Sequence, residues 1–435
     1  MPAQDYPLDA IRSRFPALSL DRDIGGRIYL DNPAGTQVPE TVVERMSRCL
    51  LDANANLGGA FESSRRAGEI VADAHQAMAD FLHAPSPDEI VFGQNMTSLT
   101  FHLSRSIGRA LSAGDEVIVT RMDHDANVWP WVMMARDHGL EVKWLPFDPE
   151  SGEFELARLD ELLTERTRLV CVGGASNLIG TLNDVAAISA RARAAGAWTF
   201  VDAVQSAPHV PTDVQALGCD FLVCSAYKFF GPHQGILWGR REILESLEPY
   251  KVRPAPDTLP GRFETGTQSH EGMAGVEAAV DYFAALGEEY AAHYADRFPA
   301  MNGRTLHIHA ALAWLFDYEE GLTRHLVDGL QSLPGVRVHG ITDPAHFSRR
   351  VPTVAFSLRD VAPAMIAREL GQRRIFVWSG HNYALEAVRS LGLMEAGGVI
   401  RVGPVHYNST DEIDVLLSTL ESLLPRIAPA VAGGR

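Results

Sequence analysis

Two residues of opposite charge follow neighbouring apolar runs of this sequence. Asp202 comes directly after the apolar segment 198–201, and Lys228 lies 26 positions later (228 − 202), shortly after the segment 221–224. If both segments are strands of a parallel sheet, their carboxyl ends meet at one edge, where such sheets bind ligands. A lysine amine at that edge can form a Schiff base with an aldehyde, while a carboxylate beside it can hold a nitrogen in its protonated form.

The scarcity of lysine makes Lys228 informative. The chain has only three lysines, Lys143, Lys228 and Lys251, so 35 of its 38 basic residues (38 − 3) are arginine. Taken alone, Asp202 would more often be a turn residue and Lys228 a solvated side chain. As a pair they match the needs of pyridoxal 5′-phosphate (PLP), which takes a Schiff-base lysine and a carboxylate at its pyridine nitrogen.

Other residues could hold the phosphate of such a cofactor. The turn between an expected strand and an expected helix contains Asn95, Met96 and Thr97, whose backbone N–H groups could bind an anion. An ordinary helix cap explains this turn equally well. Ser225 and Tyr227, just before Lys228, add hydroxyl groups on the other side.

Three further polar residues follow expected strands and are candidates to contact the cofactor ring. His124 follows the segment 116–120 and could stack on the ring, although a single histidine is more often a structural group. Asn177 and Gln205 could meet the ring hydroxyl, and either could instead serve only in a turn.

The elements that must position these residues alternate along the chain. Apolar runs predict strands, and these lie at 89–92, 116–120, 169–172, 198–201, 221–224 and 235–238. Helical patterns lie between them, including 99–111 and a helix that begins at Asn183 or Asp184 and stops at Gly196. Strands alternating with helices predict an α/β fold with a mainly parallel sheet covered on both faces.

A chain of 435 residues is too long for one ordinary core. A loop over 253–266 and a helix to about residue 286 follow the last of those strands, and the pattern changes after residue 300. There, strand-like segments at 336–339, 353–356, 375–377 and 399–402 predict a smaller α+β domain. We therefore predict a large PLP-binding domain over 40–295 and a small domain over 296–425, which an N-terminal arm over 1–39 joins, with a frayed tail over 426–435.

Composition excludes several classes of function. The net charge of −17 argues against a nucleic-acid partner, which needs clustered Lys and Arg. We find no signal peptide and no apolar run that reaches the ~20 residues of a membrane helix. The four cysteines show no metal-binding spacing, so we expect no metal and a cytoplasmic location.

Together these residues resemble the cysteine desulfurase-like branch of the class V aminotransferase family, which are fold type I PLP enzymes. The resemblance covers most of the chain, and its motifs are Tyr29-Leu-Asp-Asn32, Val201-Asp-Ala-Val-Gln205, Ser225-Ala-Tyr-Lys228, Arg262-Phe-Glu-Thr-Gly-Thr267, and Arg401 before Tyr407-Asn-Ser-Thr410. It implies a large domain with a mainly parallel, seven-stranded type of sheet and a smaller α+β C-terminal domain.

The resemblance also assigns roles. Lys228 would carry PLP, Asp202 would pair with the pyridine nitrogen, and His124 would stack on the ring. Asn177 and Gln205 would meet the ring oxygen, while the phosphate ligands would be Ser225, Tyr227 and, from the second subunit of a homodimer with shared active sites, Thr267. Arg401 would bind the α-carboxylate of an amino-acid substrate, and we place Asn32 and Ala34 with it as substrate-binding residues.

The departures from the family pattern bear on the reaction. Desulfurases carry sulfur as a persulfide on a cysteine in a loop that resembles residues 377–384, and here Tyr383 stands in its place. Trp378 replaces a common arginine of that loop, and Tyr227 replaces a histidine. A phenol cannot carry sulfur as a persulfide, so Tyr383 is predicted either to donate a proton or only to pack.

Three outcomes remain open at this point. We favour a lyase that eliminates a β-substituent, such as the C–S bond of a cysteine derivative, after the released Lys228 removes the Cα proton. The alternatives are a class V aminotransferase and a PLP-binding partner or regulatory protein with little turnover of its own.

Overall fold

The computed structural model describes residues 6–20 and 25–427. Its largest sheet has seven strands in the order β2-β8-β7-β6-β5-β3-β4. The strands are β2 (Ile90–Gly93), β3 (Glu116–Thr120), β4 (Glu141–Leu145), β5 (Thr167–Gly173), β6 (Trp198–Asp202), β7 (Phe221–Ser225) and β8 (Gly235–Gly239). Strands β3 to β7 pair in parallel, and β8 runs antiparallel to both β2 and β7. The predicted α/β fold with a mainly parallel sheet is confirmed.

One strand of this sheet was not predicted from the sequence. Strand β4 lies at an edge and pairs only with β3, so its side chains are mostly half-buried and include Glu141 and Lys143. An edge strand can expose polar side chains to water, so β4 lacks the continuous apolar run that marks the inner strands.

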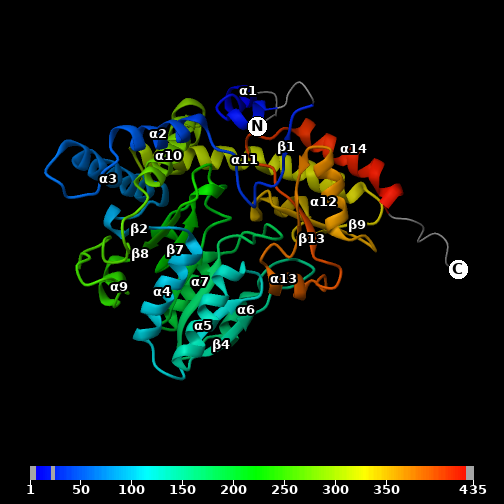
Figure 1. The fold of residues 1–435 in the computed structure, drawn as a ribbon. Coiled ribbons are helices and arrows are strands. Elements are labelled where there is room, and N and C mark those ends of the chain that lie inside the picture. Colours follow the sequence, from blue (N-terminus) through cyan, green and yellow to red (C-terminus); the bar gives the residue numbers. More distant parts are fainter. Residues whose placement is uncertain (1–5, 21–24, 428–435) are drawn as a thin grey trace.

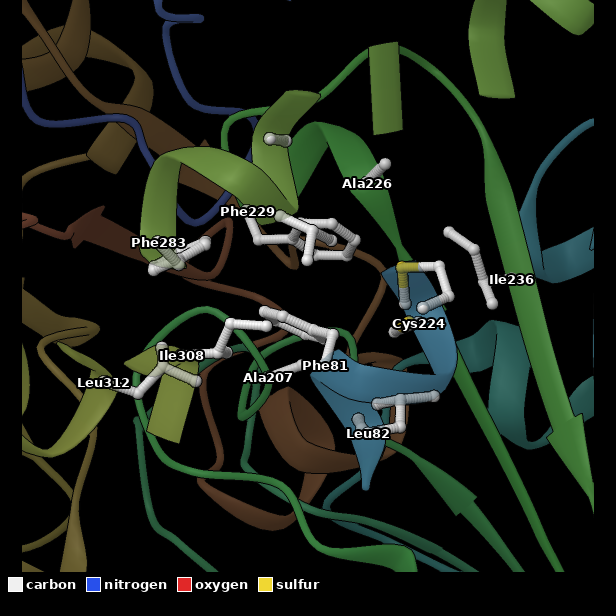
Figure 2. Close-up of a cluster of buried hydrophobic side chains, with 14 of the residues drawn as sticks. Phe81, Leu82, Ala207, Cys224, Ala226, Phe229, Ile236, Phe283, Ile308 and Leu312 are labelled. Carbon is white, nitrogen blue, oxygen red and sulfur yellow. The ribbon is translucent and has the colours of Figure 1, made fainter. Parts of the chain in front are cut away.

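Both faces of the sheet are buried under helices. On one face, Val201 and Leu222 share a core with α3 (Glu62–Leu82), α10 (His270–Tyr290) and α11 (Gly303–Ser332). Figure 2 shows part of this core, in which the Phe81 and Phe229 rings stack with their centroids 4.8 Å apart. On the other face, Phe200 packs among residues of α4 (Met96–Ala110) and α5 (Trp129–His138). The alternation of side chains along β6 supplies both cores.

Further helices belong to the larger part of the fold, among them the short α8 (Val214–Leu217). Helix α2 (Glu40–Asp52) packs on α10, α6 (Leu156–Leu162) and α7 (Val185–Ala194) contribute to the first core, and α9 (Arg241–Ser246) follows β8. Asp184 caps α7, with its side chain accepting a hydrogen bond from the N–H of Ala187. Helix α4 begins at Met96, three residues before the predicted start, because Asn95 is its cap.

A second sheet of four antiparallel strands forms the smaller part. Its order is β12-β13-β10-β9, and its strands are β9 (Val336–His339), β10 (Val354–Leu358), β12 (Trp378–Gly380) and β13 (Val399–Val402). Helices α12 (Pro363–Gln372) and α14 (Thr410–Ile427) share its core, and α13 (Leu385–Ser390) packs in a separate small cluster. Helix α11 contributes to the cores of both parts and extends from one to the other (Figure 1).

The N-terminal segment reaches this smaller part. Strand β1 (Ile28–Tyr29) pairs in parallel with β11 (Ile375–Phe376), which lies within the predicted strand over 375–377. Strand β12 begins after that predicted strand, at Trp378. Helix α14 continues to Ile427, which includes the first residues of the predicted tail, and residues 428–435 lie outside the described residues. Within the described ranges, no helix combines the length and apolarity needed to cross a membrane.

Candidate active site

A cavity of about 390 Å³ opens at the carboxyl ends of the parallel strands. Residues of the large sheet line one side of it, and residues of β12 and β13 line another. Most of the residues singled out in the sequence line this cavity together: Ala34, Asn95, Met96, Thr97, His124, Asn177, Asp202, Gln205, Ser225, Tyr227, Lys228, Tyr383 and Arg401. The two exceptions are Asn32 and Thr267.

Lys228 lies in a short 3-10 turn directly after β7, and its side chain is buried. Its Nζ atom donates hydrogen bonds to the carbonyl oxygens of Pro33, at 2.5 Å, and Ala34, at 2.9 Å. Burial and the positive charge of Arg401 lower the pKa of Lys228 to about 7, against the smaller opposing effect of Asp202. A substantial share of Lys228 is therefore neutral near pH 7, which is the form in which an amine acts as a nucleophile or a base.

Asp202 ends β6 and is joined in the cavity by a second buried carboxyl, Asp123. Burial raises the pKa of Asp202 to about 6, and burial together with the charge of Asp202 raises the pKa of Asp123 to about 7. Asp202 accepts a hydrogen bond from the N–H of Val204 at 2.9 Å, and Asp123 accepts one from Asn127 at 2.8 Å. Two such carboxyls form a site for a cationic or protonated group.

Asp123 was not singled out from the sequence. It stands beside His124 in the segment 123–127, where acidic residues on both sides of the histidine gave no sign of which one is buried. Gly173 lets Asp123 come close, since a Cβ atom at Gly173 would lie 2.9 Å from its Oδ1 atom.

The amino end of α4 faces the cavity through Asn95, Met96 and Thr97. The Asn95 side chain accepts a hydrogen bond from the N–H of Ser98 at 2.9 Å, and the N–H groups of Met96 and Thr97 have no acceptor within the helix. Such groups bind anions. This end can approach β8 because residue 235 is glycine: a Cβ atom there would lie 2.2 Å from the Asn95 carbonyl carbon.

His124 presents an uncharged ring to the cavity. Its Nδ1 atom accepts a hydrogen bond from the N–H of Ala126 at 3.0 Å. Burial, together with the charges of Lys228 and Arg401, lowers the pKa of His124 to about 3. The ring stacks on that of Tyr383, with centroids 5.4 Å apart and planes inclined by 20°.

Arg401, on β13, is buried and connects two walls of the cavity. Its Nη1 atom donates a hydrogen bond to the carbonyl oxygen of Asn177 at 2.8 Å. The Asn177 side chain in turn donates to the carbonyl oxygen of Asn382 at 2.7 Å. Burial lowers the pKa of Arg401 to about 10, so the group stays charged at neutral pH and can bind a carboxylate.

The sequence of this chain is similar to those of known proteins. The family model described as "Aminotransferase class-V" matches residues 28–312 and 308–416. The chain belongs to the class V aminotransferase family. A cysteine desulfurase of Pectobacterium atrosepticum is 32% identical, over 96% of this chain and 98% of its own length. A cysteine desulfurase of Serratia proteamaculans is 31% identical over the same shares.

Solved structures show the same fold. The apo structure of a cysteine desulfurase from Thermococcus onnurineus superposes with a TM-score of 0.83 at 26% identity, covering 97% of this chain and 99% of that one. A cysteine desulfurase from Escherichia coli gives a TM-score of 0.81, also at 26% identity and with the same coverage. This chain is therefore a cysteine desulfurase-like member of a PLP-dependent family, as its motifs predicted.

The cavity of this class V protein fits PLP. Four buried polar atoms that line it have no hydrogen-bond partner in the described part of the chain: Asp123 Oδ1, Asn177 Oδ1, Ser225 Oγ and Arg401 Nε. Buried polar groups are normally paired, so these atoms mark where a polar ligand would lie. Lys228 would hold the cofactor, Asp202 its pyridine nitrogen, and the start of α4 with Ser225 its phosphate.

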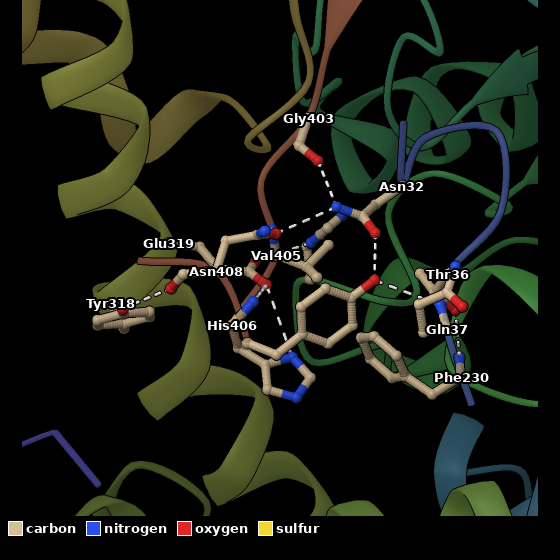
Figure 3. Close-up of polar contacts among 12 residues, drawn as sticks. Asn32, Thr36, Gln37, Phe230, Tyr318, Glu319, Gly403, Val405, His406 and Asn408 are labelled. Atoms are coloured by element: carbon tan, nitrogen blue, oxygen red, sulfur yellow. Dashed lines mark hydrogen bonds and ion pairs between the residues drawn. The ribbon is translucent and has the colours of Figure 1, made fainter. Parts of the chain in front are cut away.

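Two of the predicted site residues lie elsewhere in this class V chain. Asn32 is buried in a separate network, where it donates to the carbonyl oxygen of Gly403 at 2.7 Å and accepts from the Tyr407 hydroxyl (Figure 3). Its amide is thus occupied by protein groups and does not line the cavity. Thr267 is exposed and lines a neighbouring cavity with Gln94 and His233.

The four cysteines of the chain, all within the described ranges, are buried, and none lines the Lys228 cavity. They are Cys49, Cys171, Cys219 and Cys224. Burial raises the pKa of each thiol, to about 12 for Cys219, which suppresses the reactive thiolate.

Proposed function

We propose that this chain is a PLP-dependent lyase that breaks the Cβ–S bond of an S-substituted cysteine, without carrying sulfur on a cysteine of its own. The observation that carries the proposal is the place of Tyr383. It lines the cavity of Lys228 and stacks on His124, in the loop where the related desulfurases have their sulfur acceptor. With every cysteine buried outside that cavity, sulfur has no thiolate to attack it and must leave as a thiol.

The residues of the cavity divide the work. Arg401 holds the α-carboxylate of the amino acid, and its fixed bond to Asn177 sets the position of that carboxylate. Lys228, with its lowered pKa, takes the proton from Cα. When bound, PLP supplies an electron sink for the charge that develops at Cα. Asp202, one of the two buried carboxyls of the cavity, supports this role by holding the pyridine nitrogen.

The elimination balances without an oxidant or reductant. The Cα–H electron pair becomes the Cα=Cβ bond, and the Cβ–S pair leaves with sulfur. The proton that Lys228 removed returns to the leaving group, which departs as a thiol. The other product, 2-aminoacrylate, reacts with water to give pyruvate and ammonia.

The proposal is tested by product analysis of the holoprotein with S-methyl-L-cysteine and with L-cysteine. We expect equal amounts of pyruvate and thiol from S-methyl-L-cysteine, none of either from Lys228→Ala, and no sulfur adduct in the protein mass spectrum after incubation with L-cysteine. Alanine formed from L-cysteine together with a sulfur adduct on any cysteine would overturn the proposal. Formation of a keto acid that still contains the Cβ–S bond, with the amino nitrogen retained by the protein, would show an aminotransferase instead.

We also propose that the active form is a homodimer. Thr267 is exposed and lies outside the Lys228 cavity of its own chain, which suits a residue that serves the cavity of a second copy.

A further inference from the structure

Trp378 is a direct neighbour of the arginine that would bind the substrate. Strands β12 and β13 are antiparallel, and their register sets Trp378 opposite Arg401. Residues directly opposite one another in such a pair extend from the same face of the sheet, with Cβ atoms about 5 Å apart. Both side chains line the cavity. An amino acid whose carboxylate is held by Arg401 therefore has the indole of Trp378 beside it.

Between the aromatic rings of Trp378 and Tyr383, this wall consists of Ser379, Gly380, His381 and Asn382. Residues 378–383 contain no carboxylate, lysine or arginine, and Tyr383 closes the segment. Trp378 is 52% exposed and Tyr383 is 67% exposed, so both have apolar surface left for a ligand. Aromatic rings of this kind favour flat apolar groups, and the segment offers no lysine or arginine to pair with an acidic substituent.

The wall is held in place before any ligand arrives. Asn382 and Tyr383 both have positive φ angles, 50° and 58°, which are uncommon for non-glycine residues. The carbonyl oxygen of Asn382 accepts from the Asn177 side chain, and that of Tyr383 accepts from the N–H of Asp125 at 2.7 Å. A fixed surface loses little conformational freedom on binding, which increases the affinity that its contacts provide.

We propose that Trp378, assisted by Tyr383, selects substrates in which the sulfur carries an aromatic or bulky apolar group, such as S-benzyl-L-cysteine. This inference rests on the proposed function in that it takes Arg401 as the carboxylate site. It assigns the substrate class: cysteine thioethers with a flat apolar substituent, in preference to free cysteine or thioethers with an acidic substituent.

Binding of analogues that cannot eliminate tests the inference separately from the reaction. L-2-amino-5-phenylpentanoate and L-norvaline correspond to S-benzyl- and S-methyl-L-cysteine with CH2 in place of sulfur. We expect calorimetry on the holoprotein to give a dissociation constant at least about tenfold lower for the phenyl compound. Trp378→Ala should bring the two constants to within about twofold, and Trp378→Phe should keep most of the difference.

Two further variants sharpen the result. Trp129→Ala is the matched control, because Trp129 is 41% exposed on α5 and does not line the cavity, and it should keep the full difference. Trp378→Arg should reverse the preference toward the acidic L-2-aminoadipate. Similar constants for both analogues in the wild-type protein, or an unchanged ratio in Trp378→Ala, would overturn the inference even if pyruvate is formed. Absence of pyruvate with the ring preference intact would instead defeat only the proposed reaction.

Discussion

The Nδ1 atom of His209 lies 2.7 Å from the Oε2 atom of Glu319, and both side chains are almost completely buried. The second oxygen of Glu319 accepts a hydrogen bond from the backbone N–H of His406 at 2.9 Å (Figure 3). His209 follows the strand that ends at Asp202, and His406 follows the strand that carries Arg401. One carboxylate on α11 thus joins the two segments that deliver these residues to the cavity.

This junction predicts a large effect of Glu319→Ala on stability. The change leaves two buried donors without an acceptor, each at about 1–3 kcal/mol, so the free energy of unfolding should fall by about 2–6 kcal/mol in urea unfolding followed by fluorescence. The control is Glu320→Ala, next in the chain, whose carboxylate pairs with Arg324 at the surface. It should change stability by no more than about 0.5 kcal/mol. Equal effects of the two changes would contradict this role of Glu319.

The lowered pKa of Lys228 predicts how apo-protein takes up PLP as the pH changes. Only the neutral amine bonds with the cofactor aldehyde, so the uptake rate should rise with pH through about 7 and level off above it. With an ordinary lysine, the uptake rate would continue to rise toward about pH 10. Arg401→Gln removes one cause of the lowered pKa, so its midpoint should move to higher pH. Stopped-flow absorbance measures both profiles, and titration of free PLP affects both alike. Coincident profiles would refute the electrostatic link.

Gly235→Ala should weaken cofactor binding. A Cβ atom at this position would lie 2.2 Å from the Asn95 carbonyl carbon and 2.5 Å from the Met96 nitrogen, so the start of α4 must move away. Overpacking of this kind costs about 1–3 kcal/mol, and here it acts on the N–H groups that face the cavity. We expect a PLP dissociation constant, from the visible absorbance of bound cofactor, at least about tenfold higher. Gly68→Ala in α3, where nothing lies within 4 Å, is the control and should leave it unchanged.

The proposed homodimer predicts complementation between two inactive variants. Lys228→Ala and Thr267→Ala should each lack activity, whereas mixed dimers should regain about one competent site, which combines Lys228 of one protomer with Thr267 of the other. Thr265→Ala changes another exposed residue of the cavity that Thr267 lines, and this variant should need no such rescue. Turnover assays after subunit exchange measure the recovery. A monomer in sedimentation that keeps its cofactor and its activity would contradict the proposal.

Local patterns were enough to predict most of the fold. The inner strands β5, β6 and β7 are buried on both faces, so each is an apolar run that can be recognised without its neighbours. The same reasoning placed Asp202 and Lys228 at one edge, because parallel strands present their carboxyl ends together. Edge strand β4 was missed because water, rather than a core, covers part of its surface.

What the sequence determined by itself was therefore the chemistry of single positions: a lysine, a carboxyl, a helix start and an arginine in the order that a PLP site requires. Only the tertiary structure decided which distant groups meet. It brought Asp123 into the cavity, took Asn32 out of it, and set Trp378 opposite Arg401. The physical reason is that burial and strand register depend on the packing of segments far apart in the chain, and neither leaves a mark in the local pattern of residues.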